Sequence, residues 1–295
     1  MSVVVPAYNE AQALRRLLPE LCRDAEGLFE VFVVANGCTD GSAAVAREAC
    51  AGPGGRVLET PVANKHRAMR LADEAAGPHA FPRFYVDADV EITARDLLLL
   101  AEALDDGALL AVAPERRIPD QGCPWTVRWF HEVWLRLPAI RAGLFGRGVI
   151  GVSAEGHARL AALPELMGDD LAASLAFAAH ERAVVPGARS VVHPPRTYRD
   201  LIRRRTRVAT VTAQAGARPE LAAAGAAART SNRDLLAVLR ENPLLAPKIA
   251  WFAFVAVRSR RAARRAIAEA DYTTWLRDES SRTAPAGAGH GTGAR

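Results

Sequence analysis

Short apolar runs alternate with helical hydrophobic patterns along the first half of the chain. Apolar residues at helical spacing, such as Leu14, Leu17, Leu18 and Leu21, predict helices between these runs. Strands that alternate with helices are typical of βαβ units, so we expect a Rossmann-like, mostly parallel central sheet flanked by helices. The expected strands are Val3–Val5, Glu30–Val34, Arg56–Glu59, Phe84–Val86 and Leu109–Ala113.

The second half is less regular and more helical. Trp125–Leu137 has the pattern of an amphipathic helix, and helices dominate after Tyr198. The Ala-, Gly- and Thr-rich residues 280–295 are expected to be a disordered tail. Three further short strands are expected at Val149–Ser153, Ala183–Val185 and Val191–His193.

Polar clusters follow three of the expected strands. Tyr8-Asn9-Glu10, Asn36-Gly37 and Asp87-Ala88-Asp89 each stand where a strand ends. Because ligands of parallel α/β sheets bind at the carboxyl ends of the strands, we expect a binding site at this edge.

The pair Asp87 and Asp89 is the first candidate for chemistry. Two carboxylates directly after a buried strand can hold Mg²⁺ or Mn²⁺, which completes its shell with water and substrate phosphates. An ion there would neutralise charge on a diphosphate leaving group. The alternative is a pair of solvated loop acids, since so short a motif also arises by chance. The position after the strand favours the metal site.

Three motifs occur in a recognisable order: VVVPAYNE at residues 3–10, VVANGCTDGS at 33–42 and DAD at 87–89. In order and spacing they resemble the GT-A glycosyltransferases of family 2, which typically have VxxPxYNE, VDDGSTDGS and DxD. The resemblance covers about residues 1–210 and implies a GT-A catalytic domain there. A helical C-terminal extension, residues 211–279, and the tail would follow.

The resemblance also implies a nucleotide site. Asn36 replaces the second acid of the family pattern and Ala35 the first, so the base need not be uracil. Lys65, at the family's GK segment, would approach the nucleotide or diphosphate together with Asp87. The alternative for Lys65 is a solvated lysine at a helix start. The residues placed beside base and ribose are Pro6, Ala7, Tyr8 and Glu10.

A second carboxylate pair, Asp169-Asp170, stands at an expected helix start and is similar to the family's P…ED-x-x-L region. There an acid deprotonates the acceptor hydroxyl as it attacks the anomeric carbon with inversion. Asp170 is the expected base and Asp169 the second choice. The alternative is that the helix macrodipole alone favours acids at this position.

Two arginines and one histidine complete the candidates. Arg204 and Arg207 lie where processive relatives have Q-x-x-R-W, and only Arg207 matches, which argues against a polymerising synthase. Both could clamp a diphosphate, or belong to a solvated or membrane-facing patch. His193 is the candidate for an added metal ligand or diphosphate contact, although structural histidines are commoner.

Composition narrows the function classes. The 295 residues carry 38 Lys+Arg and 33 Asp+Glu, a net charge of +5, and half are hydrophobic. This balance is that of a well-cored globular protein and is too weakly basic for a nucleic-acid partner. The four cysteines form no CxxC pair, which disfavours a zinc site or disulfide framework. The opening residues lack a signal-peptide pattern, so we expect a cytoplasmic location.

Residues 244–257 are strongly apolar, and five arginines lie within the next eight residues. A spanning helix needs about 20 apolar residues, so this segment is not expected to cross a membrane. Two interpretations remain. It lies in a membrane interface with its arginines toward anionic lipid, making the protein peripheral at the inner face of the cell membrane. Alternatively, it packs on the domain with a solvated basic end.

The sequence therefore favours an inverting, divalent-metal-dependent glycosyltransferase that moves one sugar from a nucleoside-diphosphate sugar to an acceptor hydroxyl. The acceptor would be a glycan, a lipid-linked molecule or a small molecule. A nucleotidyltransferase on a similar sheet is one alternative, but the loop after the first strand lacks the glycines that hold a triphosphate. A non-catalytic basic module that binds a membrane surface is the other.

Overall fold

The computed structural model describes residues 1–22, 27–163, 169–216 and 230–268. Its centre is an eight-stranded sheet with the order β3-β2-β1-β4-β7-β6-β8-β5. In chain order the strands are β1 (Ser2–Ala7), β2 (Glu30–Asn36), β3 (Gly55–Thr60), β4 (Arg83–Val86), β5 (Val90–Glu91), β6 (Ala111–Arg117), β7 (Val149–Val152) and β8 (Arg182–Val192).

Most of the sheet is parallel. β3, β2, β1 and β4 run in one direction, and β6 and β8 are parallel to each other. β7 pairs antiparallel with both β4 and β6, and the short β5 pairs antiparallel with β8. The ends of β1, β2 and β4 therefore meet at one edge, as the sequence predicts.

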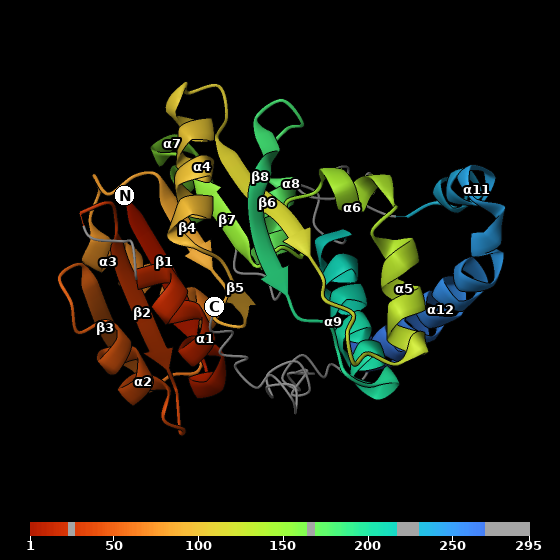
Figure 1. Ribbon diagram of the computed structural model, residues 1–295, viewed down its shortest axis with the longest axis horizontal. Helices are drawn as coiled ribbons and strands as arrows, with labels where there is room; N and C mark the ends of the chain where they lie inside the picture. Colours follow the sequence, from red (N-terminus) through yellow and green to blue (C-terminus); the bar gives the residue numbers. More distant parts are fainter. Residues whose placement is uncertain (23–26, 164–168, 217–229, 269–295) are drawn as a thin grey trace, which may run out of the picture.

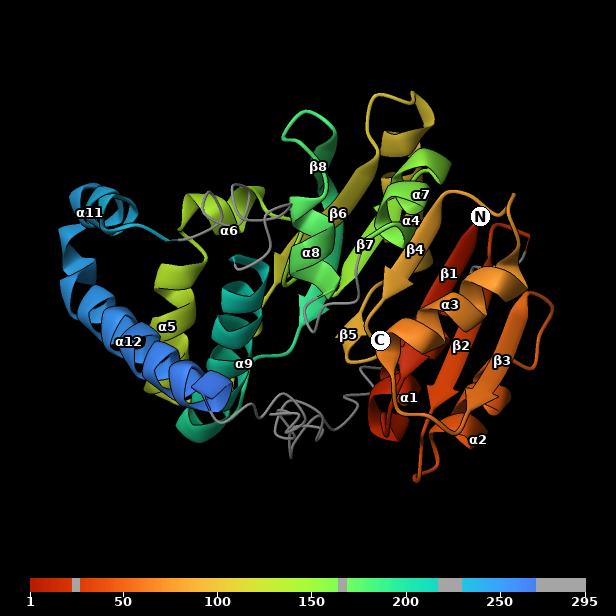
Figure 2. The same cartoon turned by 180° about the vertical axis from the view of Figure 1, so that it is seen from behind.

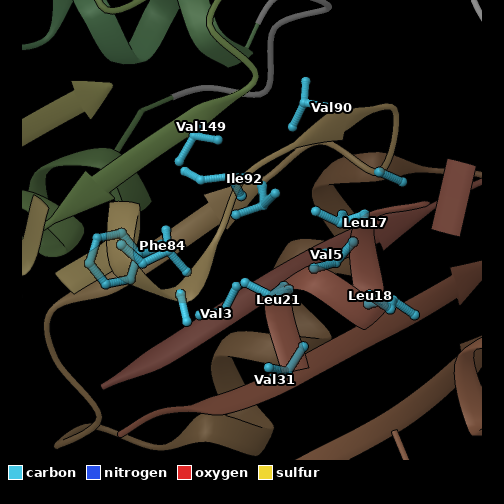
Figure 3. Packing of buried hydrophobic residues seen from close by; sticks show 14 of the residues in the cluster. Val3, Val5, Leu17, Leu18, Leu21, Val31, Phe84, Val90, Ile92 and Val149 are labelled. Atoms are coloured by element: carbon cyan, nitrogen blue, oxygen red, sulfur yellow. The ribbon is translucent and has the colours of Figure 1, made fainter. Parts of the chain in front are cut away.

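Helices cover both faces of the sheet (Figures 1 and 2). α1 (Ala11–Cys22), α2 (Ser42–Ala49) and α4 (Ala94–Asp105) pack on one face, and α3 (Lys65–Ala76) on the other. Along β1, Val3 and Val5 belong to the first core (Figure 3), whereas Val4 packs with Ala68 and Ala72 of α3. Burial on both faces explains why β1 is continuously apolar rather than alternating.

A layer of helices lies beside the sheet, beyond β6 and β8 (Figures 1 and 2). It shares a core that includes Phe130, Val133, Leu201, Phe252 and Val255. No helix in the described part of the chain is long and apolar enough to cross a membrane. The elements of this layer are α5 (Trp125–Trp134), α6 (Pro138–Ala142), α9 (Tyr198–Gly216), α11 (Asn232–Glu241), the 3-10 helix η1 (Pro243–Leu245) and α12 (Ala246–Ala268).

The remaining helices, α7 (Ala154–Ala161) and α8 (Asp169–Leu175), follow β7. Two predictions are corrected here. The strands expected at 183–185 and 191–193 are one strand, β8, which stays paired to β6 across a register shift at Pro114/Glu115. The helix expected to reach Leu137 ends at Trp134, and α6 begins at Pro138, which has no N–H to continue the earlier helix.

Side chains cap the starts of two of the helices that cover the sheet. Asn64 caps α3 by accepting from the Arg67 backbone N–H, and Thr93 forms a capping box with Asp96 at α4. The expected tail lies outside the described residues, and the boundary between catalytic domain and helical extension stays a prediction.

Candidate active site

The loops after β1 and β2 are joined by hydrogen bonds at the carboxyl edge. The Asn36 side-chain amide donates to the Ala7 carbonyl oxygen over 2.7 Å, and Asn36 is only 4% exposed. The Asn9 side-chain oxygen accepts from the backbone N–H groups of Thr39 and Asp40. Asn9 holds a left-handed backbone with φ of 52°, which asparagine tolerates better than most residues. The two loops therefore form one surface.

Asp40 links the starts of two helices. Its carboxylate accepts from the Ser42 backbone N–H over 2.9 Å and from that of Ala11 over 3.2 Å. Partial burial opposes ionisation, but hydrogen bonds from Ser42 and the backbone leave the pKa of Asp40 below its usual value. Asp40 stands one residue before the N-cap of α2, Gly41, and its carboxylate holds the first residues of both α1 and α2.

The residues predicted to meet the nucleotide base differ in exposure. Pro6 and Ala7 are buried in β1, so their side chains belong to the sheet. Tyr8 is 39% exposed at the strand end, whereas Glu10 is only 7% exposed and its backbone N–H donates to Ser42. Tyr8 is therefore the side chain of this set that the edge presents most openly.

Lys65 and Asp87 form an ion pair. Their Nζ and Oδ1 atoms are 2.7 Å apart, and the side chains are 33% and 38% exposed. Lys65 is the first residue of α3, whereas Asp87 follows β4, on the other side of β2 and β1. The lysine is thus held at the carboxyl edge rather than standing apart in solvent, which favours the site interpretation over the solvated one.

The Asp87-Ala88-Asp89 loop is anchored from the neighbouring strand β7. The Asp87 backbone N–H donates to the Gly148 carbonyl oxygen over 2.7 Å. Gly148 has φ of +68°, and a Cβ placed there would lie 2.2 Å from Val90 Cγ1. Only glycine fits this contact, so the loop position depends on the residue at 148.

The segment before β7 is held by a buried arginine that the sequence reasoning missed. Arg147 is 3% exposed, and its burial lowers the pKa of the guanidinium to about 10. Its place between two glycines just before a strand is the only sequence signal for this role. Its guanidinium donates to the carbonyl oxygens of Pro114, Ile140, Arg141 and Gly143.

The pairing of β5 with β8 places His193 near the Asp87–Asp89 loop, which directly precedes β5. Val90 pairs with Val192, and the His193 Nε2 atom lies 2.6 Å from Glu91 Oε1. The hydrogen bond with His193 lowers the pKa of Glu91 more than burial raises it. Because Arg16 is also nearby, the pKa of Glu91 is below its usual value. Sequence reasoning did not single out Glu91, although it stands only two residues after Asp89.

The two predicted arginines lie on α9. The Arg204 guanidinium donates to the His193 carbonyl oxygen over 3.1 Å, which ties α9 to the end of β8. Arg207 is half-buried one turn further along the same helix. Arg204 thus joins the group formed by His193 and Glu91.

Asp169 and Asp170 are the first two residues of α8, as predicted. Their side chains lie outside what the structure describes, so the assignment of a catalytic base stays a prediction.

The predicted metal ligands are Asp87, Asp89 and His193. In the described ranges no three His, Cys, Asp or Glu side chains are grouped as a metal site. Asp87 and Asp89 nevertheless supply two carboxylates at one strand end. Mg²⁺ in substrate-phosphate sites is commonly bound through one or two carboxylates, so this donor set fits such an ion.

A cavity of about 260 Å³ lies between α5 and the segment before it. Pro194, directly after His193, forms part of its wall. Its lining combines apolar and charged side chains, among them Ile118, Asp120, Arg128, His131, Arg136 and Pro194.

Known proteins share both sequence and fold with this chain. One relative, undecaprenyl-phosphate 4-deoxy-4-formamido-L-arabinose transferase of Edwardsiella ictaluri (strain 93-146), is 31% identical over 112 residues, which make up 36% of this chain and 34% of the relative. The chain therefore matches about a third of that protein.

Solved structures of glucosyl-3-phosphoglycerate synthase from Mycobacterium tuberculosis share the fold at 20% identity. The complex with phosphoglyceric acid has a TM-score of 0.53 and covers 72% of this chain and 79% of that one. The complex with Mn²⁺, UDP and glucosyl-3-phosphoglycerate has a TM-score of 0.51 and covers 75% and 79%. The predicted GT-A fold is confirmed.

The family model described as glycosyl transferase family 2 matches residues 2–155, more than half of the chain. This range contains the strand-end loops, Lys65, the Asp87–Asp89 loop and Gly148. The chain belongs to glycosyl transferase family 2.

Proposed function

We propose that the chain transfers one sugar from a nucleoside-diphosphate sugar to an acceptor hydroxyl, with inversion and with a divalent metal. The observation that carries the proposal is the Lys65–Asp87 pair at the edge where β1, β2 and β4 end. Family membership supports glycosyl transfer as the reaction class.

The donor nucleotide would lie against the joined loops after β1 and β2. Tyr8 is exposed enough to stack on the base, and the backbone of Pro6 and Ala7 would form the floor. Glu10 would contact the ribose at the start of α1, and Asn36 would meet the base. The diphosphate would extend toward Lys65 and the α9 arginines, Arg204 and Arg207.

Mg²⁺ or Mn²⁺ would be held by Asp87 and Asp89, with His193 as an added ligand. The synthase from M. tuberculosis was crystallised with Mn²⁺ and UDP, which supports a metal of this kind. A histidine that ligates a metal commonly donates its other ring N–H to a carboxylate, and the His193–Glu91 contact is of that type. The bound ion would supply charge neutralisation at the leaving diphosphate.

The base that deprotonates the acceptor hydroxyl would be Asp170, with Asp169 as the second choice. Both stand at the start of α8, which is the position the family resemblance assigns to this acid.

The acceptor would be a glycan, a lipid-linked molecule or a small molecule. The cavity beside Pro194 is a fitting acceptor site because it adjoins His193 and its wall carries Arg128 and Arg136. The named relatives handle undecaprenyl phosphate and phosphoglyceric acid, which supports an acceptor that bears phosphate. We place the enzyme in the cytoplasm, peripheral at the inner membrane face.

A thermal-shift panel of UDP-, GDP-, CDP- and ADP-sugars, with Mn²⁺ and with chelator, tests the donor assignment. The sugars of at least one nucleotide should shift the melting temperature only when Mn²⁺ is present. Asp89→Ala should abolish this shift while leaving the fold intact. Asp105→Ala, an exposed acid on α4, is the matched control. Unchanged Mn²⁺-dependent binding in Asp89→Ala by calorimetry would remove the metal assignment, and a product of retained anomeric configuration would remove inversion.

A further inference from the structure

The helical layer exposes an unusual share of apolar side chains. Leu244 is 84% exposed in η1, and Phe254 and Val257 are 51% and 45% exposed on α12. Trp125, 48% exposed, stands at the start of the neighbouring α5. With Leu236 of α11, these are five of the eight exposed large apolar side chains in the described part of the chain. Exposed apolar side chains that gather in one place mark interaction surfaces.

One face of α12 is buried and the opposite face is exposed. The buried face has residues at intervals of three and four, and it consists of Phe252, Val255, Ser259 and Ala263. The opposite face has the same spacing: Phe254, Val257, Arg258, Arg261 and Arg265, all exposed. This face is therefore apolar near the start of the helix and basic near its end.

The apolar half is held in place by aromatic contacts. Trp251 packs against Trp125, Tyr198 and Phe254, with ring centroids 5.0, 5.5 and 5.4 Å apart. The Trp251 indole also donates to the Thr126 carbonyl oxygen over 2.7 Å. These rings are ordered before any partner binds, so binding costs little side-chain entropy.

The basic half lacks opposite charge on its own helix. α12 contains no Asp or Glu, and its Lys248 already pairs with Glu132 of α5 over 2.7 Å. All five arginines of the helix are exposed: Arg258, Arg260, Arg261, Arg264 and Arg265. A partner that complements this half would carry negative charge spread over a surface.

We propose that this face, formed by Trp125, Leu244, Phe254, Val257 and the five arginines, docks on an anionic lipid bilayer. The apolar residues enter the boundary between headgroups and acyl chains, and the arginines bind lipid phosphates. This docking face specifies how the enzyme would reach the membrane location given under the proposed function, and it rests on that function. α9 packs along α12 and carries Arg204 to His193, so docking would hold the site at a fixed distance from the membrane.

Vesicle sedimentation of the full chain tests the proposal without donor or acceptor. Vesicles of phosphatidylcholine with about a third phosphatidylglycerol should bind the chain, and pure phosphatidylcholine vesicles should not. The double variant Arg258→Ala/Arg261→Ala should lower the partition coefficient about 30-fold, and Leu244→Ser about tenfold. Raising salt to about 0.5 M should weaken binding by screening the arginines.

Matched controls lie on the sheet side of the molecule. Arg15→Ala/Arg95→Ala, both exposed on α1 and α4, and Leu28→Ser, 40% exposed in the wild type, should bind vesicles like the wild type. Equal loss in these controls would overturn the assigned face, and equal binding to neutral vesicles would overturn the anionic partner. A dimer by light scattering that Leu244→Ser dissociates, without vesicle binding, would assign the face to a second copy instead.

Metal-dependent donor binding, measured without vesicles, separates this inference from the proposed function. Normal donor binding without vesicle binding refutes only the docking face. Vesicle binding without any donor binding refutes only the proposed transfer reaction.

Discussion

The contact between Gly148 and Val90 should control both the stability and the donor affinity of the protein. In Gly148→Ala the new Cβ would lie 2.2 Å from Val90 Cγ1, so one of the two segments must move. Alanine at φ of +68° costs about 1–2 kcal/mol. Overpacking costs a further ~1–3 kcal/mol. We therefore expect a loss of about 2–5 kcal/mol in the free energy of unfolding.

The same substitution should weaken metal-dependent donor binding. Val90 directly follows Asp89, and the Asp87 backbone N–H is bonded to the Gly148 carbonyl oxygen. Val90 and Val149 belong to the same buried cluster (Figure 3), so displacement of either residue would move the neighbouring carboxylates. Urea denaturation and calorimetry with Mn²⁺ and the donor found in the nucleotide panel measure the two effects separately.

A double-mutant cycle tests the cause. Val90→Ala alone should cost about 2 kcal/mol for the lost methyl groups and the cavity they leave. Combined with Gly148→Ala it should cost about 1–3 kcal/mol less than the sum, because the clash is gone. Gly187→Ala is the control for backbone strain alone, since Gly187 has φ of +89° and no atom within 4 Å of the added Cβ. A Gly148→Ala loss no larger than that of Gly187→Ala, or strict additivity, would refute the reasoning.

Three further outcomes are expected. Lys65→Met should leave stability within about 1 kcal/mol, because the ion pair with Asp87 is partly exposed, yet lower donor affinity about tenfold in calorimetry; an unchanged Kd would contradict its role. Asp170→Asn should bind donor normally in the same assay and lose transfer; near-normal turnover would place the base elsewhere. Burial lowers the pKa of His131 to about 3, below its value near 6.5 in the unfolded chain. Between these two pH values the unfolded state binds one more proton than the folded state. The free energy of unfolding therefore falls as the pH drops through this window. His131→Asn should flatten that slope, by up to about 1.4 kcal/mol per pH unit, in urea denaturation at pH 7 and pH 5; an unchanged slope would show that other groups cause it.

The part of the site that local patterns encode was predictable. The strands before Tyr8, Asn36 and Asp87 are continuous apolar runs, and polar residues at once after such runs mark the strand ends. Parallel pairing then places these ends together without any knowledge of side-chain contacts. The cap at Asn64, and hence the position of Lys65, follows from helix-start chemistry in the same way.

Long-range pairing was not predictable from one sequence. β5 is two residues long, too short for a periodic signal, and it forms only because β8 lies beside it. The contact between Glu91 and His193 joins residues 102 positions apart. Within β8, Pro186-Gly187 has the composition of a turn, yet the chain remains paired with β6 on both sides of it. Arg147 is buried among backbone carbonyls that include those of Pro114 in β6 and Arg141 in α6, a partner set that residue spacing does not reveal.

The replacement at Asn36 bears on which base the donor carries. The family pattern has an acid at this position, but a carboxylate cannot donate to the Ala7 carbonyl oxygen as the Asn36 amide does. With its N–H group directed to Ala7, Asn36 can offer a base its carbonyl oxygen, an acceptor like the carboxylate that it replaces. Such an acceptor can bind the ring N–H of uracil or guanine, whereas cytosine and adenine could reach it only through their exocyclic amino groups. The amide thus joins β1 to β2 while keeping an acceptor for the base. If that acceptor binds a ring N–H, UDP- and GDP-sugars should give the shifts in the nucleotide panel. A shift with CDP- or ADP-sugars alone would show that Asn36 does not bind a ring N–H of the base.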